Sequence, residues 1–279
     1  EMCIRDRRRN VKLYLNLASE GLSCLGDHNE NINPKYFNEQ KILRICKRYS
    51  DLIAGLKLRI SAEIATGSQT TSFDALRRGI EIAQRCGLPL SVHMPNFQGE
   101  LSGLIDILRP GDIFCHVYTP QKGILEDGSV SEEMKRAVQK GIILESACGK
   151  GHFGHECAGK AIQAGIEPNI ISGDFTKNTH HFEPAVSLPY LMSRFLGLGL
   201  SFEKVLSCCT TEPAKQMGME GKIGCLKTGA FANIAVLERR QKDIVFVDVK
   251  GKEVRGNELI IPVMTILEGE PVYRNMSAF

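Results

Sequence analysis

Short apolar runs alternate with stretches of helical periodicity through most of the chain, and this alternation limits the folds that are possible. Six runs read as strands, at the start of 11–22 and at 52–61, 89–93, 112–117, 142–149 and 169–175. Amphipathic stretches such as 39–51, 72–87 and 129–141 separate them, and the last two end at glycines. Near-continuous apolar strands are typical of parallel sheets covered by helices. The pattern therefore predicts an α/β fold, either a doubly wound sheet or a (β/α)8 barrel.

The barrel is the better match of the two. No Gly-x-Gly-x-x-Gly follows the first strand, so the dinucleotide-binding form of the doubly wound sheet lacks its fingerprint. After residue 220, β-rich runs separated by glycine-containing turns replace the helical periodicity. We predict a barrel over 8–219 and a small β-rich domain over 220–279.

Composition excludes several classes of protein. The net charge is only +3 over 279 residues, which argues against a nucleic-acid partner. Ten cysteines occur without any Cys-x-x-Cys, as expected of thiols kept reduced in the cytosol. No apolar stretch reaches the roughly 20 residues that a membrane span needs, and no secretory signal is visible. We expect a cytoplasmic protein without a membrane partner.

The opening residues, EMCIRDR (1–7), resemble the translation of a sequencing-library adapter. We expect them to be an artefact that should be left out of fold reasoning, with the native gene beginning upstream. The alternative is a native basic N-terminus.

Polar side chains end four of the apolar runs: Lys57, His93, His116 and Asp174. The carboxyl ends of barrel strands meet at one face, where catalytic groups lie. Imidazole and carboxylate bind divalent metals such as zinc. A lysine ammonium does not, but its neutral amine can react with CO₂ to give an anionic carbamate. Each residue alone also has a structural interpretation: a hydrogen-bonded histidine, a snorkelling lysine or a helix-capping aspartate.

Together these segments resemble the amidohydrolase superfamily, in the branch that contains dihydroorotase and the amidohydrolase-deacetylases. The resemblance covers residues 10–245. It depends on the lysine of GLKLRIS, the histidines of LSVHMPN and DIFCHVY, and the aspartate of NIISGDF. Residues 205–237 further resemble the family's threonine–proline–alanine helix and the glycine-rich entry to its small β-sandwich.

The resemblance implies a barrel with a small C-terminal β-sandwich part and two divalent metal ions, most often zinc. Lys57 would be carbamylated and bridge the ions. His93 and His116 would bind the second ion. Asp174 would bind the first ion and act as the general base while a metal-activated hydroxide attacks an amide or ester carbonyl.

The sequence departs from the family in two places. The family's His-x-His pair is absent from the chain, so we expect a barrel that lacks its first strands and is inactive as this fragment. The deacetylase-like relatives also carry Gly-His-Gly after the seventh strand, where this chain has Cys148 in place of the histidine. We expect His152 and Gly151 to contact substrate there, although a surface histidine in a flexible loop is an equal alternative.

The leading hypothesis is a deacetylase-like hydrolase of a small molecule, acting as a homo-oligomer. The alternative within the class is a dihydroorotase or cyclic amidase, for which Arg59 and Asn96 are the candidates to hold a substrate carboxylate. From another class, the chain could be a non-catalytic barrel scaffold that has lost its metals.

Overall fold

The computed structural model describes residues 11–22, 27–149, 151–176 and 185–276. The expected artefact at 1–7 lies outside them. The elements are, in chain order, β1 (Leu13–Asn16), η1 (Pro34–Tyr36), α2 (Glu39–Arg48), β2 (Ile53–Arg59), α3 (Ala62–Gly67), α4 (Ser72–Cys86), β3 (Leu90–His93), α5 (Leu101–Ile107), β4 (Ile113–Cys115), β5 (Leu125–Glu126), β6 (Ser129–Val130), α6 (Glu133–Lys140), β7 (Ile143–Glu145), α7 (His155–Gln163), α8 (Leu188–Gly197), α9 (Phe202–Cys209), α10 (Thr211–Gln216), β8 (Ile234–Val247), β9 (Glu253–Leu267) and β10 (Glu270–Arg274). Among the described helices, none is long and apolar enough to cross a membrane.

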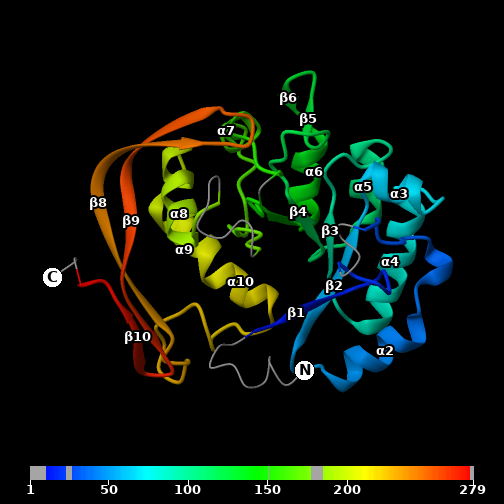
Figure 1. The fold of residues 1–279 in the computed structure, drawn as a ribbon, viewed down its shortest axis with the longest axis horizontal. Helices are drawn as coiled ribbons and strands as arrows, with labels where there is room; N and C mark the ends of the chain where they lie inside the picture. Colours follow the sequence, from blue (N-terminus) through cyan, green and yellow to red (C-terminus); the bar gives the residue numbers. More distant parts are fainter. Residues whose placement is uncertain (1–10, 23–26, 150, 177–184, 277–279) are drawn as a thin grey trace.

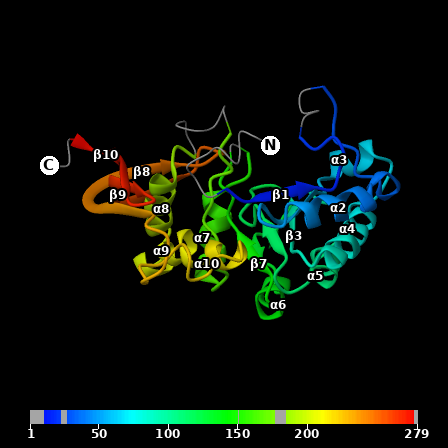
Figure 2. The ribbon, with the colours of Figure 1, turned by 90° about the horizontal axis from the view of Figure 1, so that it is seen from below.

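A five-stranded parallel sheet forms the centre of the molecule, in the order β1-β2-β3-β4-β7 (Figure 1). Helices α4, α5 and α6 make the crossovers between successive strands, and α2 joins them in one layer along the sheet (Figure 2). This succession is the repeating βα unit that the sequence predicts. Over the described residues, the sheet does not close on itself.

The sixth predicted strand, 169–175, continues the sheet beside β7 without forming a regular ladder. Glu145 and Ile170 make a single parallel bridge. Beyond it, backbone and hydroxyl partners alternate. The amide of Cys148 donates to the carbonyl of Ser172 at 2.8 Å, whereas the amide of Ala147 donates to Ser172 Oγ at 3.2 Å and that of Ser172 to Ser146 Oγ at 3.1 Å. The segment therefore lies where the pattern predicts, but the hydroxyls of Ser146 and Ser172 take part of the place of a regular ladder.

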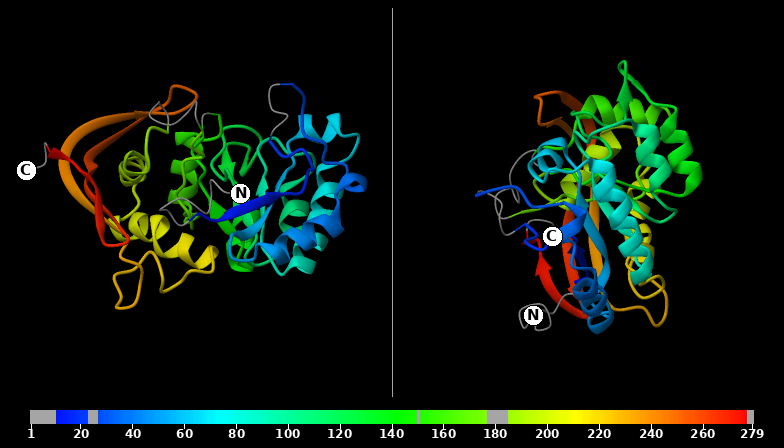
Figure 3. Two further views of the ribbon diagram at one scale, coloured as in Figure 1. Left: turned by 60° about the horizontal axis from the view of Figure 1, so that its bottom comes forward. Right: turned by 90° about the vertical axis from the view of Figure 1, so that its right-hand side faces the viewer.

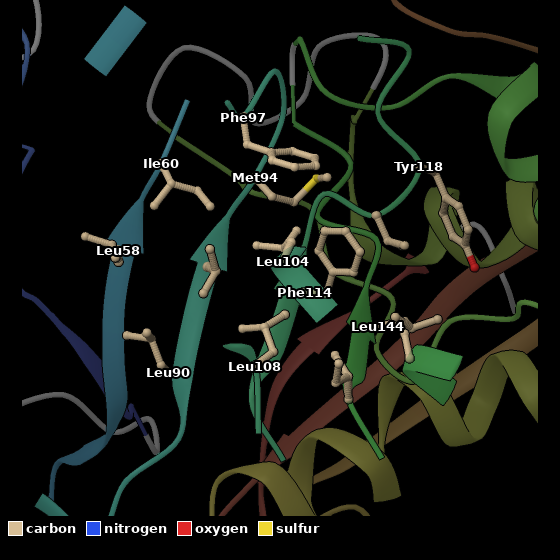
Figure 4. Packing of buried hydrophobic residues seen from close by; sticks show 14 of the residues in the cluster. Leu58, Ile60, Leu90, Met94, Phe97, Leu104, Leu108, Phe114, Tyr118 and Leu144 are labelled. Atoms are coloured by element: carbon tan, nitrogen blue, oxygen red, sulfur yellow. The ribbon is translucent and has the colours of Figure 1, made fainter. Parts of the chain in front are cut away.

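Alternation along the strands separates the core from the opposite face of the sheet. Leu58, Leu90, Phe114 and Leu144 come from four neighbouring strands, are fully buried, and pack together toward the helices (Figure 4). Because successive side chains in a strand point to opposite faces, the residues between them point away from this core. The inner face of the sheet is thus free to carry polar groups.

Glycines end the predicted helices as expected. Thr71 Oγ1 accepts a hydrogen bond from the amide of Asp74 at 3.0 Å and caps the start of α4. Gly87 ends α4 with φ 66° and Gly141 ends α6 with φ 82°. This left-handed backbone conformation is accessible to glycine at little steric cost.

The β-rich C-terminal part forms one antiparallel sheet in the order β10-β9-β8, far from α2–α4 (Figures 1 and 3). Helix α8 packs against β9, where Ser193 Oγ accepts the amide of Ile260 at 2.8 Å. The turn between β8 and β9 reaches α7, because Asp248 Oδ2 accepts the amide of His155 at 2.7 Å. A second layer, as in a β-sandwich, is not found among the described residues.

Candidate metal centre

Polar side chains line the inner face of the parallel sheet. Register pairs Lys57 with Ser91, His93 with Cys115, and Cys115 with Glu145. All five line one cavity of about 750 Å³. The strands are short, so these residues lie at or near their carboxyl ends, where parallel α/β sheets place their sites.

Three imidazoles converge in this cavity. The ring centroids of His93 and His116 are 4.6 Å apart, and the ring of His152 lies 4.9 Å from the first and 4.5 Å from the second. One nitrogen from each ring lies within 4.8 Å of the others. In the described part of the chain, this is the one group of histidine, cysteine or carboxylate side chains close enough together to hold a metal ion.

The imidazoles are in the form that binds metals. Burial lowers the pKa of His93, His116 and His152 below the ordinary value, which keeps them neutral. His116 Nδ1 lies 2.8 Å from the carbonyl oxygen of Ala147. Since a carbonyl only accepts, Nδ1 carries the proton and Nε2 keeps its lone pair for a ligand. A backbone carbonyl in this role is common behind metal-binding histidines.

The backbone is strained where the strands open into the cavity. His116, Ala147 and Asp174 have φ of 62°, 40° and 47°. Such left-handed conformations cost non-glycine residues about 1–3 kcal/mol each and persist where the surrounding structure requires them. Here His116 follows β4 and Asp174 ends the segment on the far side of β7, and both line the cavity.

Lys57 lies half-buried on the cavity wall, and its Nζ donates to Ser91 Oγ at 3.1 Å. Burial lowers the pKa of the amine, but Cys115 and the carboxylates of Glu145 and Asp174 outweigh burial and raise it. Burial itself raises the pKa of the Cys115 thiol, so that thiol stays neutral and the carboxylates carry the effect. The metal-free chain therefore holds Lys57 as an ammonium.

Asp174 faces the same cavity and contacts the loop that follows β7. Burial raises the pKa of its carboxyl, and Lys57 opposes this shift only in part. A methyl group at Gly149 would lie 3.1 Å from Asp174 Cγ and would also meet Oδ2. Glycine at 149 is thus what allows the Asp174 carboxylate to sit where it does.

Of the two residues expected to contact substrate, one reaches the cavity. His152 lines it, whereas Gly151 is exposed and is not part of the lining. His152 Nδ1 is buried without a hydrogen-bond partner among the described residues. Cys148 is buried in the hydrophobic core, where its thiol lies 3.5 Å from Ser146 Oγ.

The two residues considered for a substrate carboxylate are separated. Arg59 lines the cavity, and its Nη1 donates to Oε2 of the fully buried Glu30 at 3.0 Å. Asn96 is exposed outside the cavity, with its amide 3.5 Å from Glu63 Oε2. The structure therefore brings together Lys57, His93, His116, His152 and Asp174, and leaves Gly151 and Asn96 outside.

Strand-end reasoning missed Glu145 and Cys115, which form the inner face between Lys57 and Ser172. Glu145 Oε1 accepts from Ser172 Oγ at 2.8 Å. A signal was present in the sequence, because Glu145 interrupts an apolar run and alternates with the buried Leu144. Period-2 alternation, applied to every strand, would have found both residues.

Comparison with known proteins points to one superfamily. Residues 193–273 match the model of the amidohydrolase family. The chain is 28% identical over 276 residues to a deacetylase of Brucella anthropi and 29% identical over 276 residues to the deacetylase Atu3266 of Agrobacterium fabrum. These alignments cover 98% of this chain and 67% and 66% of the relatives, so the chain spans about two thirds of their length.

A solved structure described as a dihydroorotase superimposes on the chain with a TM-score of 0.86 and 26% identity. The match covers 96% of this chain and 71% of that one. The parallel sheet and its crossover helices thus belong to a TIM-barrel-type fold.

Proposed function

Because this chain belongs to the amidohydrolase superfamily, we propose that it carries most of the active site of a metal-dependent hydrolase that removes an acyl group from a small amide or ester. The observation that carries the proposal is the convergence of neutral, buried imidazoles with Lys57 and Asp174 in one cavity. Since the chain spans about two thirds of its curated relatives, the activity is proposed for the whole protein.

The side chains fit a divalent cation such as zinc. His116 is held with Nε2 available by the bond from Nδ1 to Ala147, and His93 is only 6% exposed beside it. Neutral nitrogen ligands and a nearby carboxylate are the donors that zinc prefers. When bound, the metal would polarise the acyl carbonyl and lower the pKa of a water molecule.

Asp174 is proposed as the proton carrier. Burial raises its pKa, which makes the carboxylate a stronger base than an ordinary aspartate. It would accept the proton of the attacking water and deliver it to the leaving nitrogen or oxygen.

Lys57 is proposed to be carbamylated in a protein that holds two ions. The reaction joins the neutral amine to CO₂ and releases one proton, and the product is an anion. The ammonium favoured by Glu145 and Asp174 must first lose its proton. A mass increase of one CO₂ at Lys57, present only in zinc-loaded protein, would support this step.

Cyclic amide hydrolysis is the second candidate, and Arg59 favours it. Its guanidinium lies on the cavity wall and can bind a substrate carboxylate. Asn96, the expected second contact, lies outside the cavity. The acyl hydrolase is therefore placed first.

The test measures acetate release from acetyl esters and N-acetyl amides by the zinc-reconstituted whole protein, with dihydroorotate assayed in parallel. We expect zinc-dependent acetate release that falls about 100-fold or more in Asp174→Asn. Asp106→Asn, at an exposed position, is the control and should leave the rate unchanged. Turnover of dihydroorotate alone would reverse the ranking, and turnover of neither would favour the scaffold alternative.

A further inference from the structure

We propose that His152 is a metal ligand, which with His93 and His116 forms a three-histidine site for one zinc-like ion. The proposal deepens the proposed function and rests on it. The sequence suggested His152 only as a substrate contact, and the structure gives three reasons to assign it to the metal.

The first reason is geometry. The three ligand nitrogens lie within 4.8 Å of one another. In tetrahedral zinc with bonds of about 2.0–2.1 Å, the nitrogens are about 3.3 Å apart. The widest pair therefore has to close by roughly 1.5 Å, a change within the reach of side-chain rotation in a metal-free site.

The second reason is an unsatisfied polar atom. His152 Nδ1 is buried and has no hydrogen-bond partner among the described residues. A buried nitrogen that is left unpaired loses its hydration without a compensating bond and destabilises the fold. Coordination would remove this cost, and the rings of His93 and His116 already lie 4.9 and 4.5 Å from that of His152.

The third reason is that His152 does not sit on a free surface loop. The next residue, Phe153, is fully buried, with its ring 6.2 Å from Tyr118 and 5.5 Å from Phe195. The following amide, that of Gly154, donates to the carbonyl of Tyr118 at 2.9 Å. These anchors hold the histidine over the cavity, so little ordering entropy remains to be lost on binding.

Three protein ligands leave a fourth position open to the cavity, which is the pattern of catalytic rather than structural zinc. One ion held in this way needs neither the carbamate on Lys57 nor the His-x-His pair that the chain lacks. Lys57 and Asp174 then remain on the cavity wall for a second ion or for proton transfer.

The experiment is a zinc titration of the 279-residue chain against a chromophoric chelator, for wild type, His152→Ala and His28→Ala. His28 is a matched control because its side chain is 61% exposed and is not among the residues that line the cavity. We expect one tightly held zinc, a loss of affinity of about 100-fold or more in His152→Ala, and a change within about threefold in His28→Ala. Equal affinity in wild type and His152→Ala overturns the proposal, as does a wild type that binds no zinc.

X-ray absorption of the zinc-loaded wild type gives a readout that needs no variant. Three imidazole ligands support the site, and two overturn it. Acetate release separates the two proposals. If the zinc-loaded whole protein shows no hydrolysis while His152→Ala loses zinc affinity, the ligand assignment stands and the proposed function is refuted. If the whole protein hydrolyses substrate while His152→Ala keeps its zinc affinity, the proposed function stands and the ligand assignment is refuted.

Discussion

Asp112 is a buried carboxylate that fixes β3, which ends at His93, relative to β4, which His116 follows. It is 1% exposed and lies just before β4. Its Oδ1 accepts the amide of Leu90, the first residue of β3, at 2.8 Å. Its oxygens also accept the amide, Nε and Nη2 of Arg109 at 2.8, 3.0 and 2.8 Å. One carboxylate thus ties the start of β3 to the turn before β4.

Asp112→Ala shortens the side chain to a methyl group and leaves the amide of Leu90 and the guanidinium of Arg109 without their acceptor. Removing one partner of a buried ion pair costs about 3–5 kcal/mol. The side chain of Arg109 is 27% exposed and regains some water, so we expect the lower end, about 3 kcal/mol, for Asp112→Ala. Zinc affinity should fall as well, because His93 and His116 lose their fixed spacing.

Urea denaturation followed by circular dichroism measures this difference. The control is Asp106→Ala, which removes an exposed ion pair with Arg136 (2.8 Å) and should cost less than about 1 kcal/mol. A loss below about 1 kcal/mol in Asp112→Ala would refute the reasoning, since it would mean that the four hydrogen bonds are replaced without penalty.

Three further predictions test the site and its surroundings. Zinc at 100 times its Kd should raise the free energy of unfolding by about 2.7 kcal/mol, which is about 5 °C in the calorimetric midpoint for a chain of this length. His93→Ala should abolish this shift, and a shift that persists in the variant would contradict the metal site. Burial raises the pKa of Glu30, so this group stabilises the fold below pH 4.5 and loses that contribution as the pH rises through its folded-state pKa. In urea titrations, wild type should therefore lose stability relative to Glu30→Gln between pH 4 and 7. A relative gain would mean that attraction to the neighbouring arginine outweighs burial. Gly149→Ala should displace Asp174 and lower kcat by about 100-fold while the far-UV circular dichroism stays unchanged. The control is Gly159→Ala, whose added methyl group meets no atom within 4 Å and should leave kcat unchanged.

Local rules determined much of this protein. Apolar runs and helical periodicity predicted the parallel strands and their crossovers in the correct order, and Gly87 and Gly141 predicted two helix ends. These features depend on side-chain periodicity and backbone sterics, which a short segment expresses by itself. The placement of Lys57, His93 and His116 follows for the same reason, because parallel strands in register bring their carboxyl ends to one edge.

The tertiary structure decided which remaining polar groups share the cavity. Cys148 and His152 are four residues apart, yet the first is buried in the core and the second lines the cavity. That choice depends on Phe153 packing against Tyr118 and Phe195, which are distant in sequence. A loop takes its conformation from such long-range contacts rather than from its own periodicity. For this reason the sequence alone supplied the candidate ligands, and only the packed fold selected the third imidazole.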